Sequence, residues 1–382
     1  MSAVIDCDQH LYETRTLWAD HIDPAARDEA LRIEDDDLGF AWVRWRDQRL
    51  GMADVQVPGQ TTVLGEHRQR WRDGLAATYS YDEMLPENYW EPHARVARLD
   101  ELGLDRAVLF PNFGLLWERR LSESLPALTA NMTAWNRWCG SVAATGAGRL
   151  APVAHLTLRD AGWLHEELTR LDRAGVRLAM VAPATVDGRP LSHPDHEPLW
   201  ASFVEHGVTP LFHVADQPRV FEDAWYTDAD ELSLPIVESV FLWTPAALAT
   251  TDLILNGVFA RHPELRLGIV ELSAIWVPMF LLMLDGAVQF TSRLNGKGPA
   301  GLEQRPSEYF RRHVRVAAFS YERPNRLRDR SDDLYMCCSD YPHSEGTASI
   351  LDDYRAVGAT PDEDHALFHD NAAFLLDDPA AG

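Results

Sequence analysis

Residues 94–111 read ARVARLDELGLDRAVLFP, and this stretch contains the pattern that repeats along the whole chain. In its first half Val96, Leu99 and Leu102 recur at helical spacing and would share one face of a helix. Gly103 follows the last of them, as glycine commonly does where a helix ends. The RAVLFP run that comes next is short and apolar, as expected for a strand that is buried on both faces. The stretch therefore predicts a helix that leads into a buried strand.

Units of the same kind extend in both directions. Eight strands are predicted at residues 4–10, 106–111, 150–158, 176–182, 208–214, 265–272, 314–319 and 334–339. Helical patterns are predicted at residues 94–103, 160–174, 198–206, 248–260, 277–294, 347–356 and 362–376. Because alternating strands and helices form parallel sheets, and eight such units can close on themselves, we expect an α/β fold, a (β/α)8 TIM barrel built as one domain over residues 1–382. No Gly-rich phosphate-binding motif follows a predicted strand, which disfavours a dinucleotide or P-loop site.

Two connections are longer than a barrel needs. Residues 11–92 follow the first strand and residues 215–247 follow the fifth, so both leave the end of the barrel where active sites lie. Long insertions in compact domains are typically functional, and we expect these two to form a lid region. Their seven tryptophans either pack the insertions onto the barrel or wall a pocket for an apolar or aromatic substrate. These are Trp18, Trp42, Trp45, Trp71, Trp90, Trp225 and Trp243.

The composition excludes several classes of partner. The 35 Lys and Arg against 59 Asp and Glu give a formal net charge of −24, which repels nucleic acid and anionic membranes. The longest apolar run, residues 276–284, is far shorter than the roughly 20 residues that span a bilayer. The first ten residues contain no Lys or Arg, and the four cysteines have neither disulfide nor metal-site spacing. We expect a cytoplasmic enzyme with a small-molecule substrate, and the 276–284 helix offers a face for a homo-oligomer.

Ionisable residues stand at the carboxyl ends of four predicted strands. In the first strand, strict alternation places Asp6 on the same face as two further polar residues, Asp8 and His10. The whole set comprises Asp8, His10, His213, Glu271, Asp340 and His343. In a closed barrel these ends converge on one mouth, where buried charge is costly unless it is paired or bound to a cation. A set of His and carboxylate groups without thiolates predicts a divalent metal, with zinc expected first, manganese or iron as alternatives, and one or two ions.

Four segments resemble a known family. They are DCDQH at 6–10, LFHVAD at 211–216, FARHPELRLGIVELSAIWVP at 259–278 and CSDYPHSEG at 338–346. The chain is similar over nearly its whole length to the amidohydrolase superfamily. The closest match is the amidohydrolase-related branch, with aminocarboxymuconate-semialdehyde decarboxylase and the resorcylate-type decarboxylases. The resemblance implies a metal-dependent (β/α)8 barrel whose ligands would be Asp8, His10, His213 and Asp340.

The resemblance departs from the family pattern at three places. Asp8 stands where many members have a His, and Glu271 stands where decarboxylases of the branch usually carry an acid/base His. No Lys follows the fourth strand, so a carbamylated lysine that bridges two metals is not expected.

The first functional expectation is a metal-dependent hydrolase of a small apolar or aromatic carboxylic-acid derivative. Asp340 would accept a proton from metal-activated water, and Glu271 or His343 would protonate the leaving group. Three alternatives stay open. They are a metal-dependent non-oxidative decarboxylase of an aromatic or enoic acid, a non-haem (di)iron oxygenase, and a metal-free binding or scaffold protein.

Overall fold

The computed structural model describes residues 3–114, 117–214, 219–227, 232 and 235–377. Its centre is a sheet of eight parallel strands, each hydrogen-bonded to the next along the chain. The strands are β1 (Ile5–Leu11), β5 (Arg106–Pro111), β6 (Leu150–His155), β7 (Leu178–Met180), β8 (Thr209–Phe212), β9 (Leu267–Ile269), β10 (Val314–Ala317) and β11 (Tyr335–Met336).

Backbone hydrogen bonds also join the last strand region to the first. The Cys7 N–H donates to the Cys337 carbonyl at 3.0 Å, and the Asp340 N–H donates to the Asp8 carbonyl at 2.8 Å. The sheet is therefore a nearly closed barrel, and the predicted (β/α)8 fold is confirmed.

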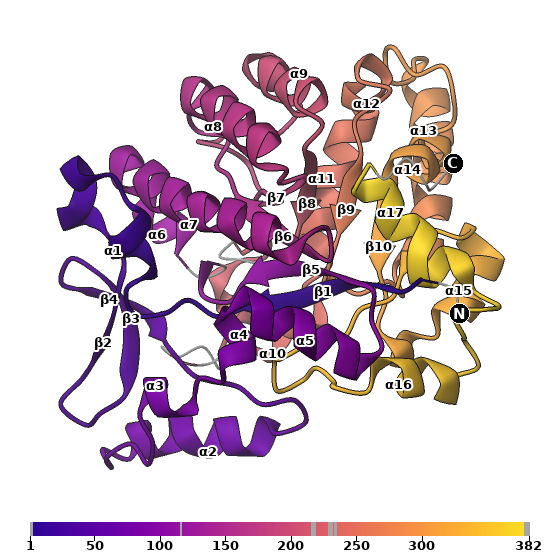
Figure 1. Ribbon diagram of the computed structural model, residues 1–382. Coiled ribbons are helices and arrows are strands. Elements are labelled where there is room, and N and C mark those ends of the chain that lie inside the picture. The colour runs from indigo at the N-terminus through magenta and orange to yellow at the C-terminus, as the bar shows by residue number, and fades with distance from the viewer. Residues whose placement is uncertain (1–2, 115–116, 215–218, 228–231, 233–234, 378–382) are drawn as a thin grey trace.

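Helices form the outer layer around the barrel (Figure 1). Local signals set their ends: in α8 the Asp160 side chain accepts from the Trp163 N–H at 2.9 Å, and Gly175 ends the helix at φ 73°. The main helices of this layer are α5 (Pro92–Leu102), α7 (Leu125–Gly146), α8 (Ala161–Ala174), α9 (Glu197–Glu205), α11 (Thr244–Leu255), α13 (Val277–Asn295), α14 (Pro306–His313), α15 (Pro324–Ser331) and α16 (Ile350–Ala356). Short helices α6 (Glu118–Leu121) and α12 (Val258–Arg261) and the 3-10 turns η3 (Pro194–His196) and η5 (Ser320–Glu322) complete the connections.

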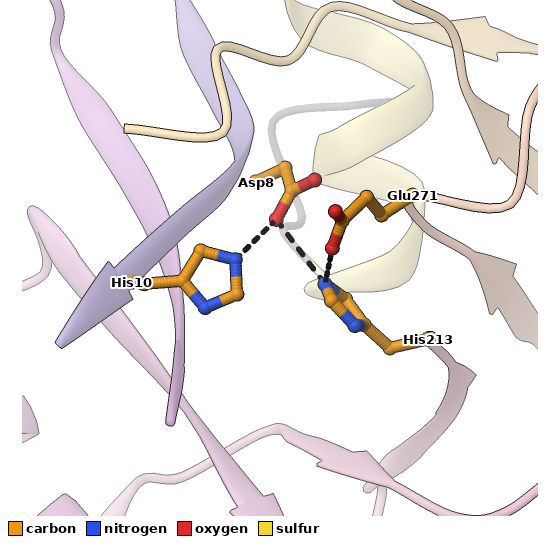
Figure 2. Close-up of side chains that lie close together, drawn as sticks. All are labelled: Asp8, His10, His213 and Glu271. Atoms are coloured by element: carbon orange, nitrogen blue, oxygen red, sulfur yellow. Dashed lines mark hydrogen bonds and ion pairs between the residues drawn. The ribbon is translucent and has the colours of Figure 1, made fainter. Parts of the chain in front are cut away.

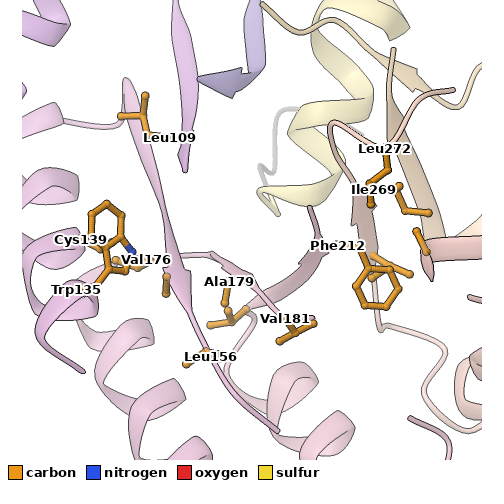
Figure 3. Packing of buried hydrophobic residues seen from close by; sticks show 14 of the residues in the cluster. Leu109, Trp135, Cys139, Leu156, Val176, Ala179, Val181, Phe212, Ile269 and Leu272 are labelled. Carbon is orange, nitrogen blue, oxygen red and sulfur yellow. The ribbon is translucent and has the colours of Figure 1, made fainter. Parts of the chain in front are cut away.

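The hydrophobic core has two parts because successive strand residues face opposite sides of the sheet. In β7, Leu178 and Met180 belong to the cluster inside the barrel, whereas Ala179 and Val181 belong to the larger cluster that packs against the helices. Figure 3 shows the larger cluster, in which strand residues meet helix residues such as Trp135.

The C-terminal helix α17 (Asn371–Leu375) closes the amino-terminal end of the barrel. Its Ala372, Ala373 and Leu375 side chains join the cluster inside the barrel. The packing there is tight: a Cβ at Gly268 in β9 would lie 2.4 Å from the Leu211 side chain and 2.8 Å from that of Leu375. A larger residue would not fit at this point without moving its neighbours.

Several predicted boundaries were wrong. The strands at 176–182, 265–272 and 334–339 are shorter than predicted, because their last residues leave the ladder before the mouth. The helix predicted at 248–260 is two helices, α11 and α12, separated by Gly257 at φ 75°. The helix predicted at 362–376 is a π turn, η6 (Ala366–Asp370), followed by α17.

The segment 11–92 contains an antiparallel sheet that the sequence pattern did not predict. Figure 1 shows this sheet on the side of the molecule away from both termini. Its strands are β2 (Arg32–Asp35), β3 (Ala41–Trp45) and β4 (Gln48–Met52), and the segment also holds α1 (Leu17–His21), η1 (Pro24–Glu29), α2 (Thr61–Arg72), α3 (Tyr81–Met84) and α4 (Glu87–Trp90). The segment 215–247 holds η4 (Asp223–Trp225) and α10 (Ile236–Val240), and residues 215–218, 228–231 and 233–234 lie outside the described part. No helix in the described ranges is long and apolar enough to cross a membrane.

Candidate metal centre

All six predicted site residues meet at the carboxyl end of the barrel. Figure 2 shows four of them pointing toward one another, Asp8 and His10 from β1, His213 after β8 and Glu271 after β9. The Nε2 atom of His213 lies 3.4 Å from Asp8 Oδ1 and 3.2 Å from Glu271 Oε2. One ligand-type atom from each of the four lies within 4.8 Å of every other.

The remaining two residues join this group through His10. The Nε2 atom of His10 lies 3.5 Å from Asp8 Oδ1 and 3.2 Å from Asp340 Oδ1. The Nδ1 atom of His343 is 2.7 Å from the same Asp340 oxygen, and the rings of His10 and His343 stack at 3.9 Å. Asp340 and His343 thus complete a second group of four together with His10 and Glu271.

Backbone conformation aims two of the carboxylates. Glu271 and Asp340 both adopt φ 55°, a left-handed conformation that is uncommon for these residue types and is associated with functional sites. Gly346 packs directly against the backbone of Asp340. A Cβ at Gly346 would lie 2.3 Å from the Asp340 carbonyl oxygen, so the loop after β11 requires glycine there.

The first strand carries an irregularity at the site. Its pairing with β5 shifts register between Asp6 and Gln9, so the strict alternation that placed Asp6 beside Asp8 was wrong. Asp6 instead accepts hydrogen bonds from the Ser339 hydroxyl at 2.5 Å and from the Gln9 amide at 2.8 Å. Burial raises the pKa of Asp6 to about 7, even though these bonds act in the opposite direction.

Backbone carbonyls fix the tautomers of two histidines. The Nδ1–H of His10 donates to the Pro111 carbonyl at 3.3 Å, and the Nδ1–H of His213 donates to the Val214 carbonyl at 2.9 Å. Because a carbonyl can only accept, each ring carries a hydrogen on Nδ1 and turns Nε2 toward the carboxylates. Metal-binding histidines are commonly oriented in this way.

Residues that the sequence analysis did not name support the site. Asn112, directly after β5, places its Oδ1 atom 2.7 Å from Nε2 of His343. Arg95 of α5 is fully buried and donates to the His10 carbonyl at 2.8 Å and to Gln9 Oε1 at 3.1 Å. Asn112 could have been found as a polar residue at a strand end, whereas nothing in the pattern of α5 marks Arg95 as buried.

Because several acids and histidines are buried together in the cluster, they shift one another's pKa values. Burial, reinforced by the charges of Asp340 and Asp8, raises the pKa of Glu271 well above its ordinary range. Burial alone would raise the pKa of Asp8, but its contacts with His10 and His213 lower it below the usual value. Burial would lower the pKa of His10, and its contacts with Asp340 and Asp8 outweigh that effect and raise it to about 10.

The donor set fits a divalent cation. Among the described residues, Asp8 Oδ2 and Asp340 Oδ2 are buried without a hydrogen-bond or ion-pair partner. The nitrogens of His10, His213 and His343 that face the cluster meet only carboxylate oxygens of the cluster itself. A buried polar atom left unpaired costs about 1–3 kcal/mol, and a cation among them would satisfy several at once. All the donors are imidazole nitrogens or carboxylate oxygens, which suit zinc, manganese or iron.

Other His-containing groups in the described ranges are of a different kind. His165 with Glu205 and His206, and His365 with His369 and Asp370, lie at the surface. Asp370 already pairs with His365 and His369 at 2.9 and 3.0 Å. The four cysteines are all buried and free, as expected.

A cavity of about 1070 Å³ opens above the cluster and reaches Glu271 and His343. Both long insertions contribute to its wall, through Met52 and Gln56 of the first and through Leu242 and Trp243 of the second. Of the seven insertion tryptophans, Trp18, Trp42 and Trp45 are fully buried in packing and Trp225 is exposed. Packing, the first of the two alternatives, therefore holds for Trp18, Trp42 and Trp45, and Trp243 is the one of the seven found among the described residues that line the cavity. The described aromatic lining is Phe113, Trp243, Trp276, Phe319 and Tyr321.

Comparison with known proteins places the chain in a family. The sequence profile of the amidohydrolase family matches residues 5–377, so the chain belongs to the amidohydrolase family. The expected resemblance is confirmed at this level. Among curated proteins none matches the chain.

Solved structures share the fold over the whole chain. An amidohydrolase from Mycobacterium avium subsp. paratuberculosis K-10 is 24% identical, with 98% of each chain covered and a TM-score of 0.79. A 5-carboxyvanillate decarboxylase from Novosphingobium aromaticivorans, crystallised with manganese, is 16% identical, covers 98% of this chain and 96% of its own, and has a TM-score of 0.66. A 2,6-dihydroxybenzoate decarboxylase from Rhizobium is 16% identical over 99% of both chains, with a TM-score of 0.59.

Proposed function

We propose that this protein is a metal-dependent decarboxylase that removes the carboxyl group of an aromatic acid. The observation that carries the proposal is the convergence of six His and carboxylate side chains, with unpaired buried atoms, at the base of an aromatic-lined cavity. The decarboxylases among the similar structures support this reaction by analogy of fold. They support it better than hydrolysis, which was the first expectation from the sequence and is not confirmed.

The residues proposed to hold the metal are Asp8, His10, His213 and Asp340. Their positions, charge and fixed tautomers suit this role. When bound, the metal supplies a positive charge that anchors the substrate carboxylate. The zinc, manganese and iron alternatives share these ligands, and the chain's manganese-bound structural relative favours manganese for the first reconstitution.

The proton chemistry falls to Glu271 in this proposal. Loss of CO₂ breaks the ring–carboxyl bond, and a proton must form a new C–H bond at the same ring carbon. Glu271 is only 16% exposed and reaches into the cavity, so its carboxyl group is placed to hold that proton. It stands where decarboxylases of the resembled branch usually carry a His. Water replaces the proton after the product leaves.

The cavity wall suits an apolar ring. Phe319, Trp243 and Trp276 offer flat apolar surfaces near the cluster. Loss of CO₂ turns a charged carboxylate into a neutral molecule, which a site with little water favours. We propose that residues 11–92 and 215–247 act as the lid region that keeps water out, since both line the cavity.

The test is a set of hydroxy- and methoxybenzoic acids, each labelled with ¹³C at the carboxyl carbon and incubated in D₂O with the manganese-loaded protein. We expect labelled CO₂ and one deuterium at the ring carbon that carried the carboxyl group. The Glu271→Gln variant should retain its metal and lose at least 100-fold in rate, because it cannot supply the proton. Esters and amides of the same acids serve as the comparison, and their hydrolysis without CO₂ release would reject the proposal in favour of hydrolysis.

A further inference from the structure

The cavity above the metal centre is much larger than a single-ring acid. Its volume is about 1070 Å³. An acid with about ten non-hydrogen atoms occupies roughly 200 Å³ at the packing density of a protein interior. Pockets that bind drug-sized molecules measure about 300–1,000 Å³, so this cavity matches the largest of them. A single-ring acid bound at the metal centre would therefore leave most of the cavity to water.

A cavity that stays full of water does not suit the proposed reaction. Loss of CO₂ from a carboxylate is favoured where little water surrounds the reacting group. Each part of a substrate that covers apolar wall displaces water from it, and this strengthens binding in proportion to the area covered. A substrate that fills the cavity would meet both requirements.

The wall of the cavity provides a large apolar surface for such a substrate. Trp243 and Trp276 stack with their ring centroids 5.7 Å apart and both line the cavity. Further apolar side chains come from the first insertion, from the second insertion and from the start of α13. They are Leu50, Met52, Leu242, Ile275 and Met279. Aromatic rings and hydrocarbon chains pack well against a wall of this kind.

The arginines of the described wall already interact with other groups of the protein. The wall contains Arg68, Arg119 and Arg219. The Nε–H of Arg68 donates to Asp54 Oδ2 at 2.9 Å, and Nε of Arg219 lies 3.6 Å from Glu238 Oε2. Arg119 also has an interaction within the protein. These arginines are therefore not held in reserve for a second carboxylate of the substrate.

The acids of the wall would repel a second negative charge. Outside the metal cluster, four acids line the described wall: Asp54, Glu238, Glu322 and Glu345. They outnumber the three arginines. Glu322 is held by the Ser273 hydroxyl at 2.6 Å and by the Ala274 N–H at 2.8 Å, so its charge stays beside the cavity. The part of the substrate that lies away from the metal should therefore be uncharged.

We propose that the substrate is an extended aromatic acid. One carboxylate, on the ring that reacts, meets the metal centre, and an uncharged apolar body of at least one further ring fills the rest of the cavity. This substrate class rests on the proposed decarboxylase function and adds to it the size and charge of the substrate. Single-ring acids carry the same reacting group and should be turned over with a lower kcat/KM.

A series of acids that share one reacting ring tests the proposal. It contains a hydroxybenzoic acid, the same acid with a phenyl group at each free ring position, and each phenyl isomer with a second carboxylate at its far end. We expect kcat/KM of the manganese-loaded protein to be about 10-fold or more higher for at least one phenyl isomer than for the single-ring acid, because the added ring buries apolar surface. The second carboxylate should reverse this gain.

Two variants that narrow the cavity provide the second readout. Leu50→Trp in β4 and Leu242→Trp before α11 each place a larger side chain in the wall, from different insertions. Each should reduce the preference for the best phenyl isomer over the single-ring acid about 10-fold. Val63→Trp is the control, because Val63 is an exposed residue of α2 that is not among the described lining residues, and it should leave the preference unchanged. Circular dichroism and metal content establish that the variants are folded.

A kcat/KM that is no higher for any phenyl isomer than for the single-ring acid would overturn the proposal. A preference for the dicarboxylates would overturn the uncharged body, and an unchanged preference in both narrowed variants would show that the extra ring binds elsewhere.

Affinity separates this proposal from the proposed function. Calorimetric titration of the metal-loaded Glu271→Gln variant, which should not turn the acids over, measures how tightly each acid binds. If no acid releases CO₂ from the wild type but the phenyl isomers bind more tightly than the single-ring acid, the decarboxylase function fails and the size of the ligand stands. If CO₂ is released fastest from the single-ring acid, the reaction stands and the extended substrate is rejected.

Discussion

Two hydrogen bonds to backbone carbonyls decide what His10 and His213 can do. Each bond keeps the hydrogen on Nδ1 and leaves Nε2 facing the carboxylates of Asp8, Glu271 or Asp340. Asp8, Glu271 and Asp340 crowd three buried carboxylates around these nitrogens, and Asp8 Oδ2 and Asp340 Oδ2 have no partner, which is unfavourable unless a cation binds there. The arrangement is therefore best explained as a metal centre.

Removing one imidazole should empty the centre. The His213→Ala variant is expected to lose most of its bound metal, because only three of the four proposed ligands then remain. Elemental analysis of the purified variant measures this directly. His262→Ala is the matched control, since His262 lies outside the cluster and pairs with Glu197 at 2.9 Å. Full metal content in His213→Ala would remove His213 from the ligand set.

A histidine remote from the centre should control part of the pH dependence of stability. His313 is buried at the end of α14, where its Nδ1–H donates to the Leu265 carbonyl at 2.6 Å and its ring stacks on Phe259 at 4.6 Å. Burial lowers the pKa of His313 from 6.5 to about 4. Between these values the unfolded chain binds a proton that the folded protein does not, so this residue makes the free energy of unfolding fall as the pH decreases.

The His313→Gln variant should lack that contribution. We expect its free energy of unfolding, measured in urea at pH 7.5, 6.5 and 5.5, to decrease less steeply toward acid than that of the wild type. The difference between the two slopes isolates His313 from the carboxylates, which titrate in both proteins. Parallel curves would show that His313 is as easily protonated in the folded protein as in the unfolded chain.

At the scale of elements, the loop after β11 holds the centre in place. It carries Asp340 in a left-handed conformation, and Gly346 lies against the Asp340 carbonyl with no room for a side chain. Strain of this kind persists where the surrounding structure enforces it. The close contact explains why this loop can position a carboxylate that no helix or strand holds.

The Gly346→Ala variant is expected to displace Asp340 and weaken metal binding about 10- to 100-fold, as is typical when the support of a metal ligand is lost. Metal affinity by competition with a chelating dye is the measurement. Gly65→Ala provides the control, because Gly65 lies in α2 with open space around it and should gain roughly 0.5–1 kcal/mol in helix stability. Unchanged affinity in Gly346→Ala would show that the loop tolerates the added methyl group.

The elements that the sequence failed to predict depend on distant contacts. The irregularity in β1 arises where Asp6 accepts from Ser339, more than 300 residues away in sequence, and local alternation carries no trace of it. The β2–β4 sheet has short strands of mixed polarity, and its buried Trp42 donates to Asp36 at 3.0 Å rather than packing on the barrel. The strands were predicted too long for a related reason. The residues that follow each strand are also buried and apolar, so their sequence resembles strand although they make no ladder hydrogen bonds.

At the scale of the whole molecule, the barrel and the position of its mouth could be predicted from the sequence. Eight buried strands in alternation with helices predicted closure, and closure brings all the carboxyl ends together. For that reason Asp8, His213 and Asp340 could be grouped from the sequence although they lie far apart in it, and the structure brings them together. The supporting residues Asn112 and Arg95 could not be assigned in this way, because their roles depend on the distance to one side chain or one carbonyl.

The size of the cavity also belongs to this scale. It is not a local property, because residues of both insertions line the cavity. The space above the cluster therefore depends on residues far from it in sequence.

The measurement that tests the account most directly is a titration of manganese into chelator-treated protein, with release of ¹³CO₂ from a carboxyl-labelled aromatic acid followed at each step. We predict no release from the metal-free protein and release that rises in proportion to the metal bound, and we predict that His213→Ala gives neither binding nor release. Release of CO₂ without metal, or a fully metal-loaded protein that releases none from any aromatic acid, would contradict the account.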